Sequence, residues 1–129
     1  MSVRSVIFRE LRLVVTFEEG RVTFDEMLAN LNRLAHDPEF DPDFNQLSDA
    51  SLATDSDLSS ANIRFLYQRP VFSPASRRAV VAPNDFTYGM ARMIQSYVET
   101  SKAAVQVQIF RDRASALAWL GVSEDLLKS

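Results

Sequence analysis

The sequence predicts an α/β fold, a mostly parallel sheet of five strands with about four helices in the order β-β-α-β-α-β-α-β-α. Short apolar segments alternate with longer segments whose apolar residues recur at helical spacing. An unbroken apolar strand at 79–82 leads through Pro83 and Asn84 into a long helix. Close to half of the 129 residues are apolar, so we expect a single domain over residues 1–129 with one core.

The chain begins with two segments in which β-branched and aromatic residues roughly alternate with polar ones. These segments predict strands over 3–8 and 11–17, joined by a hairpin about Arg9 and Glu10. Because right-handed crossovers make the later strands parallel, we expect the first strand to lie antiparallel at an edge of the sheet.

The first helix has the clearest start signal of the chain. Thr23 as the N-cap and Glu26 three residues later form a capping box, and Val22 is placed to pack on Met27. The helix is expected to end near His36, before the Asp-Pro pair that follows. One apolar stripe runs along it, formed by Phe24, Met27, Leu28, Leu31, Leu34 and Ala35.

The segment 37–43 is acidic and contains two prolines. It lacks the glycine that a calcium loop needs for its sharp turn, so we predict a solvated loop and no metal site. A strand follows and ends on Asp49, and a loop is expected over 50–55. The helix after this loop is predicted to begin near Ser56 or Asp57 and to bury Leu58, Ala61, Ile63, Leu66 and Tyr67.

The long helix that follows the strand at 79–82 is capped by Asn84 or Asp85. Gly89 lies inside it and costs about 1 kcal/mol relative to alanine, which predicts a close backbone approach by a neighbour or a ligand. A last strand at 104–110 leads to a short helix that Asp112 caps. The apolar stripe of the long helix consists of Phe86, Met90, Met93, Ile94, Tyr97 and Val98.

Composition excludes several classes of protein. The formal charge is −3 and the pI is about 5.1, whereas nucleic-acid binding needs a basic face. The chain has no cysteine, which excludes disulfides and thiolate metal sites. It shows neither a signal peptide nor a run of about 20 apolar residues that would span a membrane. We therefore expect a cytoplasmic protein that needs no cofactor and binds no nucleic acid.

A ligand pocket is the strongest candidate for a functional site. In open α/β sheets, ligands collect beyond the carboxyl ends of the parallel strands. Side chains at these strand ends and on the first turns of the long helix are expected to meet there. The candidate ligand-binding residues are Asp49, Ser51, Asn84, Phe86, Tyr88, Gly89, Arg92 and Arg111.

A second candidate surface is the segment before the strand at 79–82. Val71 and Phe72 stand between two prolines, which leaves two interpretations. In one, Phe72 folds back and plugs the core. In the other, the pair forms an exposed apolar tip that touches a membrane surface. The candidate membrane-contact residues are Val71, Phe72, Arg69, Arg77 and Arg78.

Three segments resemble a known family: GRVT at the first helix, RRAVVAPNDFTYGMARM in the middle, and VQIFRDRASALAWL at the end. Together they make the chain similar to the SpoIIAA-like or STAS-type family of small bacterial proteins. The resemblance covers nearly the whole chain, and the middle segment is its most specific part. It implies a four-helix, mixed five-strand α/β fold related to that of the CRAL-TRIO lipid carriers.

The resemblance implies a non-enzymatic binding or regulatory module that holds a small apolar or lipid-like ligand and touches membrane surfaces at its periphery. The alternative is a protein-interaction module of a partner-switching circuit, with Ser51 or Thr54 as phosphosite and a protein partner. Regulatory members of the family carry the modified serine in an Asp-Ser-Ser-Gly turn, which this chain lacks after Asp49. A third hypothesis is an enzyme that uses Asp49 with Glu18 or Glu19. A homodimer is left open.

Overall fold

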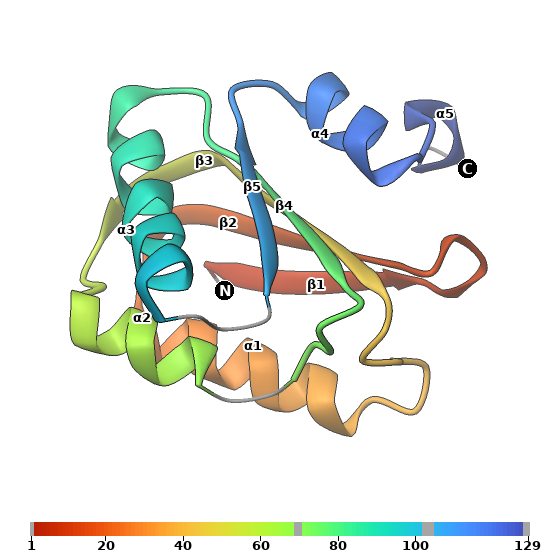
Figure 1. Ribbon diagram of the computed structural model, residues 1–129, viewed down its shortest axis with the longest axis horizontal. Coiled ribbons are helices and arrows are strands. Elements are labelled where there is room, and N and C mark those ends of the chain that lie inside the picture. The colour runs from red at the N-terminus through yellow and green to blue at the C-terminus, as the bar shows by residue number, and fades with distance from the viewer. Residues whose placement is uncertain (1, 69–70, 102–104, 128–129) are drawn as a thin grey trace.

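The computed structural model describes residues 2–68, 71–101 and 105–127. Its described strands form one five-stranded sheet whose spatial order follows the chain, from β1 to β5 (Figure 1). The first pair is antiparallel and the remaining three pairs are parallel, so the sheet is mixed, with its antiparallel strand at an edge as predicted. The strands are β1 Val3–Phe8, β2 Leu13–Val22, β3 Asn45–Ser56, β4 Arg77–Val81 and β5 Gln106–Phe110.

Helices cover both faces of the sheet, which confirms the predicted α/β class. In Figure 1, α1 and α2 lie below the sheet and α4 and α5 above it. The helix α3 packs with the face that α1 covers, because its Ala91 contacts Val80 while α4 packs on Val81. The helices are α1 Phe24–His36, α2 Ser60–Tyr67, α3 Asp85–Ser101, α4 Arg113–Leu120 and the short α5 Glu124–Leu127.

The alternation of side chains along the strands divides the core into two layers. On the α4 side, Leu117 and Leu120 pack against a continuous apolar surface of the sheet, made by Leu13, Val15, Leu47, Ala79 and Val81. On the other side, Val14 packs with Leu34 of α1, and Val80 packs with Ala91 of α3. This second face carries fewer large apolar side chains, and the candidate site lies there.

The connection between β1 and β2 differs from the predicted hairpin. A short 3₁₀ turn, η1 Arg9–Leu11, precedes Arg12, whose backbone is left-handed with φ 51° and ψ 49°. Because this residue breaks the extended conformation, β2 begins at Leu13 rather than at residue 11. The strand also continues to Val22, beyond the predicted end at residue 17.

The prediction of a loop over 50–55 is wrong, because β3 continues through this segment to Ser56. It pairs with the second half of β2, and shifts in register separate the two halves of that pairing. The irregular pairing brings Ala50 and Ala53, three residues apart, into one buried cluster with Val22. The simple alternation that marks a strand is therefore lost, which explains why the sequence pattern indicates a loop.

The predicted N-cap residues of α1, α3 and α4 are confirmed, but the capping box at α1 is only half formed, because the Glu26 carboxylate accepts hydrogen bonds from Ser2. The Thr23 hydroxyl accepts a hydrogen bond from the Glu26 N–H at 3.2 Å, and the Asn84 side chain accepts one from the Thr87 N–H at 2.9 Å. Asp112 likewise caps α4. For α2 the predicted start near Ser56 is too early, because Ser59 and Asn62 form a reciprocal capping box and the helix begins at Ser60.

Candidate functional site

A cavity of about 260 Å³ lies between the sheet and the three helices α1, α2 and α3. Its walls are mainly apolar, and each of the three helices contributes to them. The sheet forms its floor through the side chains that point away from α4. The apolar lining includes Val22, Met27, Leu31, Leu58, Ile63, Leu66, Met90, Ala91 and Ile94.

Polar side chains cross the floor of this cavity in a chain of hydrogen bonds. The Arg78 Nε–H donates to Gln46 Oε1 at 3.0 Å, and Gln46 Nε2 donates to Thr16 Oγ1 at 2.9 Å. Thr16 Oγ1 lies 2.8 Å from Ser5 Oγ, which donates to Asn30 Oδ1 at 2.9 Å. The chain joins β4, β3, β2, β1 and α1. It satisfies Thr16, Gln46 and Asn30, which are nearly inaccessible to solvent.

Arg78 makes three contacts at one end of this hydrogen-bond chain. Its guanidinium carbon lies 4.6 Å from the centre of the Phe72 ring and 4.8 Å from that of Tyr67. Cation–π contacts of this kind, together with the hydrogen bond to Gln46, restrict the orientation of the guanidinium. Arg78 also lines the cavity, so its charge faces a space with largely apolar walls.

Glu18 brings a second ionisable group to the same cavity. It is half-buried and lines this space. Burial raises the pKa of the Glu18 carboxyl group from its ordinary value of 4.5 to about 7, and the charge of Asp49 adds to the rise. Within the part of the chain that the structure describes, no hydrogen bond or salt bridge stabilises its ionised form.

Tyr67 contributes a phenol to the cavity wall. Burial raises the pKa of this phenol, the positive charge of Arg78 lowers it, and Glu18 raises it. The arrangement thus provides one fixed cation, one carboxyl group that ionises near neutral pH, and one phenol, all set among apolar side chains. Such a combination can bind and orient a small amphipathic molecule.

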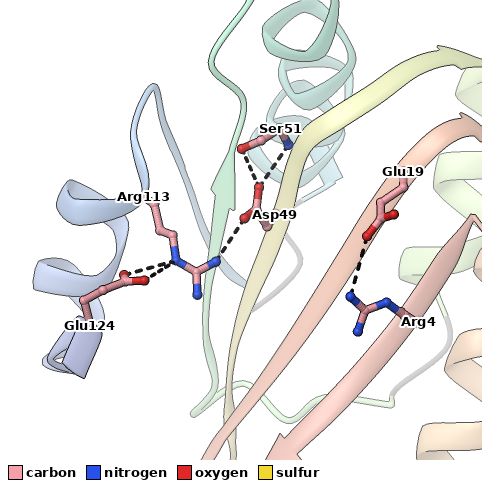
Figure 2. Close-up of polar contacts among 6 residues, drawn as sticks. All are labelled: Arg4, Glu19, Asp49, Ser51, Arg113 and Glu124. Atoms are coloured by element: carbon pink, nitrogen blue, oxygen red, sulfur yellow. Dashed lines mark hydrogen bonds and ion pairs between the residues drawn. The ribbon is translucent and has the colours of Figure 1, made fainter. Parts of the chain in front are cut away.

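The predicted residues Asp49 and Ser51 lie outside this cavity. Asp49 accepts a hydrogen bond from Arg113 at 3.0 Å and one from the Ser51 backbone at 2.9 Å (Figure 2). Arg113 also binds Glu124 at 3.0 Å and so ties β3 to α4 and α5. Figure 2 also shows Glu19 paired with an arginine of β1. Ser51 and Thr54 are exposed, and the hypothesis that either is a phosphosite stays a prediction.

The remaining predicted ligand residues gather near the start of α3. Arg111 stacks over the Tyr88 ring at 3.9 Å and pairs with Asp85 at 3.6 Å. Asn84 serves as a helix cap, and Arg92 is exposed. Of the eight candidates, Phe86 alone lines the cavity.

Gly89 does not have the close neighbour that the sequence predicts. It is exposed, and a methyl group there would meet no atom of another described element within 4 Å. The glycine is therefore not required by packing within the described residues.

The candidate membrane-contact residues divide between several places. Val71 and Phe72 are half-buried and pack on the core cluster of Val14, Leu34 and Phe44. The Phe72 ring lies 5.2 Å from that of Phe40, so the plugging interpretation matches the structure. Arg78 lines the cavity, whereas Arg77 is exposed and donates to the Trp119 carbonyl at 3.0 Å. Arg69 lies outside the described residues.

The polar floor of the cavity is not among the features that the sequence predicts. Thr16 and Gln46 occupy strand positions that point inward, where alternation predicts apolar residues. An inward polar residue is the signal that would have marked them, and two such residues on adjacent strands strengthen it. Ser48, one step along the same face of β3, belongs to the same pattern.

The fold and the cavity define a layered α/β protein with an internal cavity that is partly polar. No protein-family model matches the chain, and no curated protein matches it. Among the described helices, none has the length and apolar character to cross a membrane. The described residues also contain no group of three or more potential metal-ligating side chains of His, Cys, Asp or Glu.

Proposed function

We propose that this protein is a binding module that holds a small, largely apolar ligand between the sheet and the helices α1, α2 and α3. The observation that carries the proposal is the cavity of about 260 Å³, in which a few polar groups stand among apolar walls. A cavity of about 150 Å³ is enough for benzene, so this one suits a ligand on the order of a dozen non-hydrogen atoms.

The environments of the carboxylates support binding rather than catalysis. Glu18 faces the cavity, Glu19 pairs with Arg4, and Asp49 is held by Arg113. Glu18 is near enough to Asp49 for that charge to raise its pKa, but Asp49 and Glu19 are each paired with an arginine. The resemblance to the SpoIIAA-like family supports the same proposal, because it implies a non-enzymatic module.

Membrane contact is not part of this proposal. The hypothesis needs Val71 and Phe72 at an exposed tip, and both side chains pack into the molecule. Reaching a bilayer would expose apolar surface that is now covered and would remove the ring that stacks on Arg78.

Filling the cavity tests the proposal. Ala91 is buried on the cavity side of α3, and Ala91→Leu would place a larger side chain in that space. We expect 1-octanol to raise the melting temperature of the wild-type protein but not that of Ala91→Leu. The matched control is Ala118→Leu, since Ala118 is exposed on α4 and its variant should respond like the wild type.

Two outcomes contradict the proposal. One is that the wild type shows no response to 1-octanol by calorimetry or thermal shift. The other is an equal response in Ala91→Leu, which would place the bound molecule elsewhere.

A further inference from the structure

The position of the Arg78 guanidinium indicates the chemistry of the ligand, whereas the shape of the cavity indicates only its size. The side chain emerges from β4, and its guanidinium carbon lies over the rings of Phe72 and Tyr67, 4.6 and 4.8 Å from their centres. Its Nε–H is already used by Gln46. Little conformational freedom is left to lose on binding, which is the property of a preorganised site.

One edge of this guanidinium remains available. An arginine offers two edges for a bidentate contact, and the edge that includes Nε is taken by Gln46. The edge formed by Nη1 and Nη2 has no acceptor among the described residues. Both nitrogens keep some accessible surface, so a ligand can reach them. Two parallel N–H donors on a planar fork match the two oxygens of a carboxylate.

The charges that line the cavity favour a single negative charge on the ligand. Its charged lining residues are Glu18, Asp55 and Arg78. Asp55 is paired with Arg21, and no salt bridge to Arg78 occurs within the described residues. Below neutral pH the Glu18 carboxyl group is largely uncharged, which leaves Arg78 as an uncompensated cation facing the space.

The same balance disfavours a doubly charged phosphate group. One guanidinium neutralises one negative charge, and a second charge would remain unpaired among apolar walls. A carboxylate carries one charge, and an apolar body of about eight carbon atoms fills the size that the cavity allows.

We propose that the ligand is a monocarboxylic acid with an apolar body, whose carboxylate binds the Nη1 and Nη2 edge of Arg78 while its body lies along α1, α2 and α3. This assignment rests on the proposed function, since it names the class of molecule that the cavity holds. Arg78 is then the residue that determines specificity for the head group, and the apolar walls determine the length of the body.

Three probes of equal chain length test the assignment: octanoate, 1-octanol and octylamine. We expect calorimetry at about pH 6 to show octanoate binding about ten- to a hundredfold more tightly than 1-octanol, with octylamine weakest. In Arg78→Gln the advantage of octanoate over 1-octanol should disappear, while the affinity for 1-octanol changes little. Arg78→Lys keeps the charge without the planar fork and should retain only part of the advantage.

Arg77→Gln is the matched control, because the neighbouring arginine is exposed and bonds to the Trp119 carbonyl rather than facing the cavity. This variant should keep the full preference for octanoate. Circular dichroism establishes whether each variant is folded. If Arg78→Gln does not fold, Arg78→Lys provides the test.

Equal binding of octanoate and 1-octanol would overturn the assignment but leave the proposed function standing. Tightest binding of octylamine would overturn it as well, and would make Glu18 the group that selects the ligand. If both Arg78 variants keep the full preference for octanoate, its carboxylate binds at a position other than Arg78. A wild-type protein that binds none of the three probes would contradict the proposed function itself.

Discussion

At the scale of single residues, Glu18 contributes to the pH dependence of stability. Burial raises the pKa of its carboxyl group from 4.5 to about 7 in the folded protein. Below pH 4.5 the group is protonated in both states. Between pH 4.5 and 7 the unfolded chain loses this proton while the folded protein keeps it, so the free energy of unfolding falls as the pH rises. Above pH 7 the carboxyl group is ionised in both states, and the free energy of unfolding does not fall further through Glu18.

We therefore expect Glu18→Gln to be more stable than the wild type at about pH 8, by about 2 to 3 kcal/mol, with little difference at about pH 4. Urea denaturation at several pH values measures this. The matched control is Glu19→Gln, because Glu19 is paired with Arg4 on a more exposed surface and does not line the cavity. A difference between wild type and Glu18→Gln that does not change with pH would contradict the prediction.

Gly89 is a second residue at which we expect a substitution to change the stability in a defined direction. It lies in the interior of α3, and no other described element comes near the position of a methyl group. Gly89→Ala should stabilise the protein by about 0.5 to 1 kcal/mol, because alanine loses less backbone entropy in a helix.

The contrasting variant is Gly121→Ala, where φ is +75° at the C-cap of α4. Alanine is strained in that conformation, so this change should destabilise the protein by about 1 kcal/mol. Thermal unfolding of both variants measures the two effects, and destabilisation by Gly89→Ala would show that its surroundings are tighter than described.

At the scale of elements, Arg113 fastens the C-terminal helices to the sheet. Its guanidinium binds Asp49 of β3 and Glu124 of α5, both at 3.0 Å, and it is more buried than the exposed Arg111. Arg113→Leu leaves the Asp49 carboxylate without this partner in a site where its side chain is only 14% exposed. We expect a loss of about 1 to 3 kcal/mol in unfolding free energy.

The same variant should increase hydrogen exchange in α5, since one of the contacts that hold α5 is removed. Arg111→Leu is the control, because Arg111 pairs at 3.6 Å with the fully exposed Asp85 and such a pair contributes little. Equal stability losses in the two variants would show that the burial of the Arg113 pairs has no energetic consequence.

The elements themselves were largely predictable from the sequence. Caps such as Thr23, Asn84 and Asp112 depend on one side chain and a backbone N–H three residues away, so the local sequence contains the whole interaction. The extension of β3 through Ala53 depends on irregular pairing with β2, a strand more than twenty residues earlier. Because the local sequence does not indicate pairing with a distant strand, its pattern predicts a loop for this segment.

At the scale of the whole molecule, the site could not be predicted from local patterns. The general rule for open sheets places the ligand at the strand ends, where Asp49 is instead held by Arg113 and Arg111 pairs with Asp85. The cavity forms because three helices distant in sequence leave space over small and polar residues such as Thr16 and Ser48. Its existence depends on how far each helix stands from the sheet, which alternation and helical periodicity do not specify.

The order of the strands has a consequence for how the protein is made. Each strand pairs with the one synthesised just before it, so a nascent chain leaving the ribosome can extend the sheet strand by strand. The helix α4, whose Leu117 belongs to one apolar cluster with Leu47 and Val81, emerges after all five strands. Until α4 has been synthesised, the apolar residues of β3 and β4 that it packs on therefore stay in contact with water, and they form a surface that a chaperone would meet.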